Sequence, residues 1–220
     1  MTRQSVRDFY NEQYARHREK KIECPHALHD LDKANRRVAG VMRAFGLPRH
    51  PGFKALDVGA GLGFYTKALA IAGADVTGID FSESAIDAAR ATFPECKFEY
   101  ASWPDDVTAE PSYDLIWMVN FSLMNTFDVH FIKEALVEQA ILRLTKGGAL
   151  VVGWNSDFSG RVVGGYSHWS LDTLRDLGRQ CGLSAPLVTE ARTAGASWLL
   201  VRCARMVGRS IPVFMVRRKF

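Results

Sequence analysis

The stretch that most constrains this chain is residues 55–63, where an apolar strand runs directly into a glycine-rich turn, Ala-Leu-Asp-Val-Gly-Ala-Gly-Leu-Gly. Glycine accepts positive φ angles and has no Cβ, so such a turn brings backbone N–H groups close to a ligand. The dinucleotide fingerprint G-x-G-x-x-G would place its third glycine at position 64, where this chain has Phe64. The compressed spacing therefore fits NAD poorly.

Hydrophobic periodicity around this turn predicts alternating strands and helices. Short apolar runs indicate strands, and the stretches between them repeat apolar residues every three or four positions, as helices do. This alternation is typical of a parallel sheet covered by helices on both faces, which binds ligands at the carboxyl ends of its strands. The expected strands lie at about 54–58, 75–79, 97–100, 113–119 and 149–154, and the expected helices at about 63–72, 83–92 and 128–145.

Both ends of the chain contain further predicted elements. Val6, Tyr10 and Tyr14 fall four apart, and apolar residues between 31 and 45 repeat at three or four, so two amphipathic helices precede the glycine-rich turn. Residues 170–182 begin with serine and end with glycine, which are typical start and stop signals of a helix. The remaining sequence predicts a strand near 186–192, a helix near 196–207 and a last strand near 212–218.

Two acidic residues complete the pattern around the turn. Asp57 stands two positions before Gly59, and the second predicted strand ends in Asp80. Over roughly residues 53–155 this pattern resembles the class I S-adenosylmethionine-dependent methyltransferases. The resemblance implies an α/β fold with a single, doubly wound, mostly parallel seven-stranded sheet, helices on both faces, an antiparallel last strand and an N-terminal helical lid. It also implies that residues 1–50 form the lid or substrate cap and residues 51–220 the S-adenosylmethionine-binding domain.

The same resemblance implies a set of cofactor contacts. Asp57 is expected near the cationic groups of the methionine tail, and Asp80 is expected to accept hydrogen bonds from the ribose hydroxyls; alternatively, Asp80 only caps the following helix. The family usually carries an aspartate after the third strand, where this chain has Ser102 and Trp103. Trp103 either covers the adenine ring or packs in the core. The expected cofactor contacts are Tyr14, Asp57, Gly59, Ala60, Gly61, Gly63, Asp80, Phe81, Ser102, Trp103 and Asn120.

The transferred methyl group is expected near the ends of the fourth and fifth strands. An alcohol or phenol acceptor must lose a proton, which a general base can take. His168 follows a glycine-rich stretch predicted to be a flexible loop and is the first candidate; its alternative is a helix cap or a surface position. His17, on the first helix, is the second candidate. The expected acceptor contacts are Phe121, Asn125, Trp154, Asn155, Arg161 and Tyr166.

Composition and missing motifs argue against several classes of function. The four cysteines are far apart, with no C-x-x-C pair, so neither a disulfide framework nor a zinc site is expected, and no other metal constellation is visible. The net charge is +4 and the basic residues are dispersed, which argues against a nucleic-acid partner. No apolar run is long enough to cross a bilayer, and the polar start predicts no secretory signal. We therefore expect a cytoplasmic monomer or homodimer, with at most peripheral membrane contact.

These observations lead to one main functional hypothesis and two alternatives. The main hypothesis is transfer of a methyl group from S-adenosylmethionine, without a metal, to an O or N atom of a small-molecule acceptor. A sugar, a natural-product intermediate and a lipid-linked glycan all suit the expected pocket. The first alternative is a nicotinamide-dependent oxidoreductase on the same type of sheet. The second is a protein that binds S-adenosylmethionine without catalysis, because a fold and a cofactor loop do not guarantee an active site.

Overall fold

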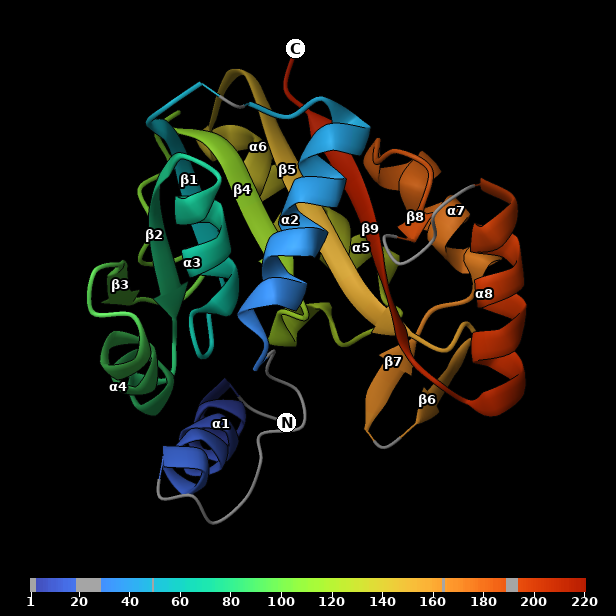
Figure 1. Cartoon of the computed structure of the whole chain (residues 1–220), viewed down its shortest axis with the longest axis horizontal. Coiled ribbons are helices and arrows are strands. Elements are labelled where there is room, and N and C mark those ends of the chain that lie inside the picture. The colour runs from blue at the N-terminus through green and yellow to red at the C-terminus, as the bar shows by residue number, and fades with distance from the viewer. Residues whose placement is uncertain (1–2, 19–28, 49, 164, 189–193) are drawn as a thin grey trace.

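A seven-stranded sheet forms the centre of the molecule in the computed structural model (Figure 1). Its strands are β1 (Phe53–Val58), β2 (Ala74–Asp80), β3 (Lys97–Tyr100), β4 (Tyr113–Val119), β5 (Leu144–Ser156), β8 (Leu187–Val188) and β9 (Ile211–Arg218). The strand order is β3-β2-β1-β4-β5-β9-β8. Only β9 is antiparallel to its neighbours, β5 and β8, so the predicted sheet is confirmed. The structure describes residues 3–18, 29–48, 50–163, 165–188 and 194–220.

Helices cover both faces of this sheet. Two of them, α2 and α3, pack on one face, in front of the strands in Figure 1, and η2, α6 and α7 pack on the other. The two helices expected before the glycine-rich turn are present as α1 and α2. The helical segments are α1 (Arg3–Arg18), α2 (Leu31–Phe45), α3 (Phe64–Ile71), α4 (Glu83–Thr92), η1 (Ser122–Met124), α5 (Val129–Phe131), η2 (Ile132–Glu138), α6 (Gln139–Arg143), α7 (Leu171–Cys181) and α8 (Ala194–Val207).

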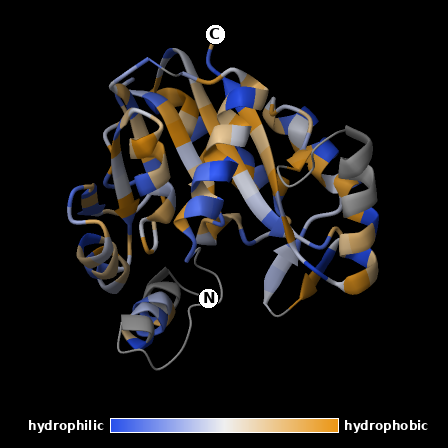
Figure 2. Ribbon diagram, viewed as in Figure 1, coloured by the Kyte–Doolittle hydropathy of each residue, from blue (hydrophilic) through white to orange (hydrophobic). Residues whose placement is uncertain are grey.

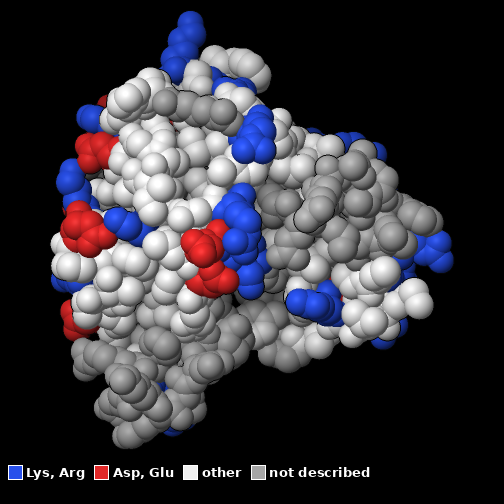
Figure 3. All heavy atoms as spheres, viewed as in Figure 1, with Lys and Arg blue, Asp and Glu red and all other residues white. Residues whose placement is uncertain are grey.

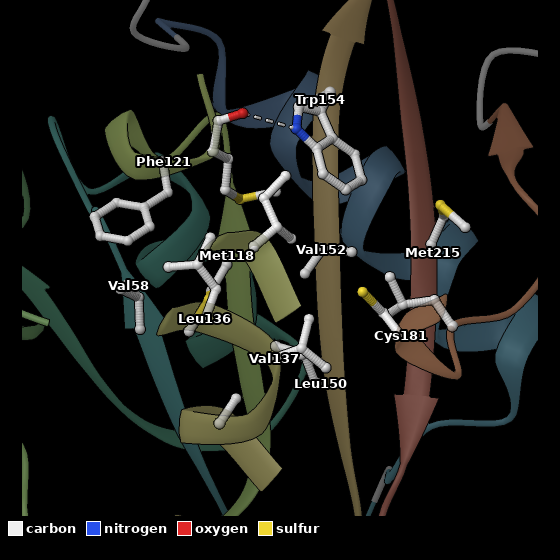
Figure 4. Close-up of a cluster of buried hydrophobic side chains, with 14 of the residues drawn as sticks. Val58, Met118, Phe121, Leu136, Val137, Leu150, Val152, Trp154, Cys181 and Met215 are labelled. Carbon is white, nitrogen blue, oxygen red and sulfur yellow. Dashed lines mark hydrogen bonds between the residues drawn. The ribbon is translucent and has the colours of Figure 1, made fainter. Parts of the chain in front are cut away.

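The central strands are apolar on both faces because successive side chains enter different clusters. On β4, Trp117 belongs to the cluster beneath α2 and α3, and Ile116 and Met118 belong to the cluster on the opposite face. All three side chains are fully buried. Met118 pairs in register with Val58 of β1 and Val152 of β5, and these three residues form part of the second cluster (Figure 4). Burial on both faces therefore explains the continuous apolar runs in the sequence.

Several helices begin and end at residues whose chemistry suits those positions. Asp30, Ser82 and Ser170 each accept, through the side chain, a hydrogen bond from a backbone N–H in the first turn of α2, α4 and α7. Gly46 and Gly182 end α2 and α7 with φ angles of 58° and 65°, in the left-handed region that glycine tolerates best. These caps agree with the helix signals in the sequence, including those predicted for 170–182.

The helical stretch predicted over 128–145 is present over residues 129–143. It consists of three consecutive segments, of which the central one, η2, is a π-helix. The helical part ends at Arg143, and β5 begins at Leu144, before the predicted start at 149. Gly148 makes the longer strand possible, because a Cβ there would lie only 3.0 Å from the carbonyl oxygen of Thr145 and 3.1 Å from that of Tyr113. The sequence pattern gave no sign of this close backbone approach.

A short hairpin follows β5 where the sequence predicted a flexible loop. β6 (Arg161–Val163) and β7 (Tyr166–His168) form an antiparallel pair that is separate from the main sheet. The loop expectation is therefore wrong for the described residues of this stretch. Three residues per strand are too few for an alternating pattern to be read from the sequence.

The last third of the chain follows the predicted order of elements with shifted bounds. β8 contains only two residues of the strand predicted at 186–192, and residues 189–192 lie outside the described part of the chain. α8 begins at Ala194, slightly before the predicted start at 196. No helix in the described part of the chain combines the length and the apolar character needed to cross a membrane.

Trp117 offers a direct test of the core on the α2–α3 side. Its indole is fully buried between Tyr65 and Phe214, with ring centroids at 5.6 and 5.7 Å. We expect Trp117→Ala to lower the free energy of unfolding by about 3–5 kcal/mol, measured by urea titration. The indole N–H has no hydrogen-bond partner in the structure, and an unpaired buried donor is itself destabilising. Trp117→Phe should therefore cost less than half as much; equal costs would contradict this account.

Candidate functional site

A cleft of about 250 Å³ opens at the carboxyl ends of β1, β4 and β5. Its walls come from the turn after β1, the ends of β4 and β5, the β6–β7 hairpin and α1. Of the residues predicted for the site, those that line the cleft are Tyr14, Gly59, Ala60, Gly61, Asn120, Phe121, Asn125, Trp154, Asn155, Tyr166 and His168. The predicted site residues that do not line the cleft are Asp57, Gly63, Asp80, Phe81, Ser102, Trp103 and Arg161. The side chain of His17 lies outside the described residues.

The turn after β1 is closely packed against its neighbours. Gly59 and Gly61 have φ angles of 77° and 54°. A Cβ on Gly59 would lie 2.7 Å from the ring of Phe121, and a Cβ on Gly61 would lie 2.8 Å from the hydroxyl of Tyr14. Real Cβ atoms do not approach other atoms so closely, so both positions need glycine for conformation and for space. A Cβ on Gly63 would lie 2.6 Å from the ring of Phe98, beneath the turn, so glycine at this position allows the ring to pack closely.

Two buried carboxylates lie behind this turn, at the ends of β1 and β2. Asp57 is 2% exposed and accepts a hydrogen bond from the hydroxyl of Thr66, with 2.7 Å between the oxygens. Burial, together with the negative charge of Asp80, raises the pKa of Asp57 to about 7. Burial likewise raises the pKa of Asp80 to about 6, against the opposing effect of backbone N–H donors. No lysine, arginine or histidine among the described residues forms an ion pair with either carboxylate.

The raised pKa values have a consequence for stability. Both exceed the ordinary aspartate value of 3.8, so the folded protein holds more protons than the unfolded chain between about pH 4 and 7. Ionising Asp57 and Asp80 in the fold therefore lowers the stability as the pH rises through this window. A cationic ligand near them would favour the ionised forms and offset that loss.

Asp80 connects the glycine turn to the start of α4. One carboxylate oxygen accepts a hydrogen bond from the backbone N–H of Gly61 at 3.0 Å, and the other accepts one from Ser82 at 2.9 Å. The alternative that Asp80 caps α4 is wrong, because the N-cap is Ser82, whose hydroxyl accepts from the N–H of Ala85. An ionised carboxylate can accept further hydrogen bonds at the same oxygens. Asp80 is thus able to receive hydroxyl donors while it holds the turn.

The first helix lies against the same turn. Tyr14 is 7% exposed and its hydroxyl faces Gly61. Tyr10 packs edge-on against Phe81 with 5.8 Å between the ring centroids, and the side-chain oxygen of Asn11 accepts a hydrogen bond from the hydroxyl of Ser82. These contacts place α1 over the turn and the first residues after β2.

Trp103 lies in the core and not in the cleft. It is 4% exposed, its indole N–H donates to the carbonyl oxygen of Ala135 at 3.1 Å, and its ring faces the guanidinium of Arg143 at 5.0 Å. Of the two alternatives for Trp103, this geometry supports packing. The neighbouring Ser102 donates its backbone N–H to the carboxylate of Asp106. The adenine contacts expected from these two residues remain predictions.

Amide side chains organise the opposite end of the cleft. Asn120 has a φ of 53°, and its side-chain oxygen accepts the backbone N–H of Asn155, which ties the end of β4 to β5. Asn125 donates to the carbonyl oxygen of Gly165 at 2.8 Å and accepts from the N–H of Ser167 at 2.7 Å. Both functional groups of Asn125 therefore hold the hairpin in place.

Two further predicted acceptor contacts occupy different positions relative to the cleft. Trp154 is buried in its wall, where the indole N–H donates to the carbonyl oxygen of Met124 at 3.3 Å. Arg161 is exposed on β6, paired in register with His168 across the hairpin. The cleft therefore has an aromatic wall but no arginine in its lining.

His168 is buried at the end of β7. Its Nδ1 accepts the backbone N–H of Asp157 at 3.0 Å and lies 3.3 Å from a carboxylate oxygen of Asp157 and 3.4 Å from the hydroxyl of Ser210. Because Nδ1 accepts a hydrogen bond, the neutral ring carries its proton on Nε2. Burial acts to raise the pKa of Asp157, but hydrogen bonds from Ser159 and the nearby His168 lower it overall. These contacts hold the ring of His168 in a fixed position, whereas the sequence predicted a histidine that follows a flexible loop.

The cleft lining also includes residues outside the predicted site, among them Ser122 and Ser210. The hydroxyl oxygen of Ser122 is buried and has no hydrogen-bond partner in the structure. Ser210 reaches the cleft from the segment between α8 and β9. A lone serine in a loop carries no sequence signal. An unpaired buried hydroxyl in a cleft is, however, the type of group that a ligand would satisfy.

The described lining of the cleft contains no lysine, arginine, aspartate or glutamate. Its polar groups are amides, hydroxyls and His168. The two buried carboxylates that lack a basic partner lie behind the glycine turn, whereas the carboxylate of Asp157, at the other end of the cleft, lies 3.3 Å from Nδ1 of His168. A ligand that carries positive charge at the end beside the glycine turn would match this distribution.

Comparison with known proteins finds similarity to methyltransferases over part of this chain. The sequence pattern of a methyltransferase domain family matches residues 55–148. A demethylmenaquinone methyltransferase from Renibacterium salmoninarum is 37% identical over 103 residues, which cover 46% of this chain and 41% of that protein. The chain thus spans less than half the length of the curated relative that it matches.

Solved structures share the fold at low sequence identity. A putative sarcosine dimethylglycine methyltransferase from Galdieria sulphuraria aligns with a TM-score of 0.61 at 14% identity, covering 95% of this chain and 98% of that one. The magnesium protoporphyrin IX methyltransferase from Synechocystis, solved with bound S-adenosylmethionine, aligns with a TM-score of 0.61 at 17% identity, covering 99% and 96%. At these identities the likeness concerns the fold.

Gly61 allows the packing of α1 on the turn to be tested. In Gly61→Ala, the new Cβ meets the Tyr14 hydroxyl, so we expect α1 to move and S-adenosylmethionine affinity, measured by calorimetry, to fall at least about tenfold. Gly73→Ala is the matched control, since Gly73 also has a positive φ, of 99°, but nothing lies within 4 Å of its Cβ position. Equal losses of affinity in both variants would show that backbone strain alone is responsible.

Proposed function

We propose that this chain, whose residues 55–148 match a methyltransferase domain family, transfers a methyl group from S-adenosylmethionine to an O or N atom of a small-molecule acceptor. The methyltransferases that it resembles support the acceptor class, since demethylmenaquinone and magnesium protoporphyrin IX are small molecules. A neutral, hydroxylated acceptor suits the uncharged lining, and a sugar, a natural-product intermediate or a lipid-linked glycan all meet that description.

The observation that carries this proposal is the pair of buried carboxylates beside the glycine turn. Without a basic partner, Asp57 and Asp80 have raised pKa values, and the turn in front of them has room for backbone approach only because Gly59 and Gly61 lack a Cβ. When bound, S-adenosylmethionine supplies an activated methyl group on a sulfonium cation, together with an ammonium group. Asp57 would hold the cationic tail, and Asp80 would accept the ribose hydroxyls while it keeps Gly61 in position.

The chain contributes mainly orientation to this reaction. Methyl transfer is an in-line displacement, and fixing the reacting groups accounts for up to about 7–11 kcal/mol of the barrier in favourable cases. α1, through Tyr10 and Tyr14, covers the turn and excludes water from it. Asn125 and the hairpin fix the acceptor end. His168 contacts the acceptor and, with its proton on Nε2, donates a hydrogen bond to an oxygen beside the reacting one, while the proton that a hydroxyl acceptor loses passes to water.

Cofactor binding at different pH values tests the proposal. We expect micromolar binding of S-adenosylmethionine and S-adenosylhomocysteine by calorimetry, and none of NADH. Affinity for S-adenosylmethionine should rise with pH up to about 6 for the ionisation of Asp80 and up to about 7 for that of Asp57, and level off above. The rise should be up to about tenfold per pH unit for each group, because the cation prefers the ionised carboxylates. Asp80→Asn should weaken binding and flatten the pH profile.

Asp75→Asn is the matched control for this experiment. Asp75 is also on β2, but it is exposed and paired with Lys97, so the substitution should leave binding unchanged. Binding of NADH alone would contradict the proposal. Binding of S-adenosylmethionine without methylation of any acceptor in a broad screen would reduce the function to cofactor binding.

The role of His168 is tested by two amides of different length. Gln can place an N–H near the position of Nε2, whereas Asn reaches only the position of Nδ1. If His168 acts as a donor, His168→Gln should stay within about tenfold of the parent rate, and His168→Asn should lose about 1–3 kcal/mol of acceptor or transition-state binding. A general base would instead make both variants about 10²–10⁴-fold slower. S-adenosylhomocysteine release with an acceptor from the screen provides the measurement.

A further inference from the structure

Exposed apolar side chains gather at the corner formed by β6 and the end of α8. Val162 and Val163 of β6 are 62% and 48% exposed, and Met206 and Val207 of α8 are 81% and 72% exposed. Figure 2 shows hydrophobic colour along β6 and at the lower end of α8, each next to hydrophilic positions. Single exposed apolar residues are common on protein surfaces, but four on two neighbouring elements call for an explanation.

Contacts in the structure bring these two elements to the same corner. Arg161 of β6 is paired in register with His168 of β7, and Nδ1 of His168 lies 3.4 Å from the hydroxyl of Ser210. Ser210 follows Val207 closely in the chain, beyond a turn in which the N–H of Arg209 donates to the carbonyl oxygen of Ala204. The end of β7, which pairs with the start of β6, therefore lies beside the segment that follows α8, and in Figure 1 the hairpin is drawn next to the lower end of α8.

The charge around this corner has a single sign. Arg161, Arg205 and Arg209 are exposed there, and no aspartate or glutamate occurs in residues 158–170 or 194–220. In Figure 3 the acidic side chains lie on the left and in the middle of the molecule, among basic ones, and basic side chains also appear at the right-hand edge. Apolar side chains bordered by arginines, with no acids between them, are typical of surfaces that insert shallowly into anionic lipid headgroups.

We propose that this basic apolar corner, formed by Arg161, Val162, Val163, Arg205, Met206, Val207 and Arg209, docks on the surface of an anionic phospholipid bilayer. The proposal rests on the methyl-transfer function above and deepens it, since it makes the acceptor a lipid-soluble molecule taken from that surface. The strand β7 of the same hairpin lines the cleft through Tyr166, Ser167 and His168. Docking would thus bring the acceptor end of the cleft beside the bilayer.

A second copy of the chain is the competing occupant of this corner. In a two-fold interface the same patch meets itself, so the arginines of one copy would face those of the other. Like charges at such short range oppose association, whereas an anionic bilayer pairs with the arginines and accepts the apolar side chains. Charge complementarity therefore favours the bilayer.

Vesicle co-sedimentation tests the docking. The full chain should sediment with vesicles of mixed phosphatidylglycerol and phosphatidylcholine, and not with phosphatidylcholine alone. Removing an arginine near an anionic surface weakens binding about fivefold, so the double variant Arg205→Gln/Arg209→Gln should bind about 25-fold more weakly. Arg175→Gln/Arg179→Gln on α7 is the matched control, because both residues are exposed but paired with Asp172 and Asp176, and it should bind as the parent does.

A second variant separates shallow insertion from plain charge attraction. Val163→Thr/Met206→Gln keeps every charge and should still lose vesicle binding at least about tenfold; retention of binding would overturn the proposal. Equal losses in the α7 control, or no sedimentation of the parent chain, would also overturn it. A dimer in ultracentrifugation that is weakened by Val163→Thr/Met206→Gln, without vesicle binding, would assign the corner to a second copy.

Calorimetry on the same preparations distinguishes this proposal from the proposed function. The corner variants lie outside the cofactor end of the site, so their S-adenosylmethionine affinity should equal that of the parent. Normal cofactor binding without vesicle binding would overturn only the docking. Vesicle binding without cofactor binding would overturn only the methyl-transfer function on which the lipid-soluble acceptor depends.

Discussion

The burial of two carboxylates at the ends of neighbouring parallel strands is the constraint on which the rest of the site depends. A buried charge is costly unless polar groups or an opposite charge surround it. Here the hydroxyl of Thr66 supports Asp57, and the backbone of Gly61 and Ser82 supports Asp80. The turn reaches Asp80 through the backbone N–H of Gly61, whereas Gly59 and Gly63 leave room for the rings of Phe121 and Phe98. These hydrogen bonds offset only part of the cost of burying the two charges, and a cationic ligand can offset the rest.

The opposite end of the cleft follows a different principle, because neutral hydrogen bonds hold it together. Asn120 ties β4 to β5, and Asn125 ties the hairpin to the segment after β4. Ser122 keeps a buried hydroxyl without a partner, which lowers stability in the empty protein. Such residual cost at a binding site is a common exchange of stability for function. The two ends differ because the carboxylates behind the glycine turn have no basic partner, whereas Asp157 at the other end lies beside His168.

The sequence patterns that succeeded are local or repeat along the chain. The glycine turn, the start of α7 at Ser170 and the apolar strands could all be recognised, because each depends on neighbouring residues or on a simple period. The helix predicted over 128–145 is present, but helical periodicity could not distinguish its α from its π segments, nor reveal that β5 begins before Gly148. The hairpin failed because its strands are too short to show a pattern.

The sequence alone determined the sheet type, the place of the cofactor turn and most residues that line the cleft, since parallel strands bring their carboxyl ends to one edge whatever lies between them. Only the tertiary structure decided the surroundings of single side chains. It buried Trp103 beside Arg143, placed Tyr14 against Gly61, and set Nδ1 of His168 among Asp157 and Ser210. The physical reason is that most of these contacts join residues far apart in the chain, and packing of the whole domain, with no local pattern, selects them.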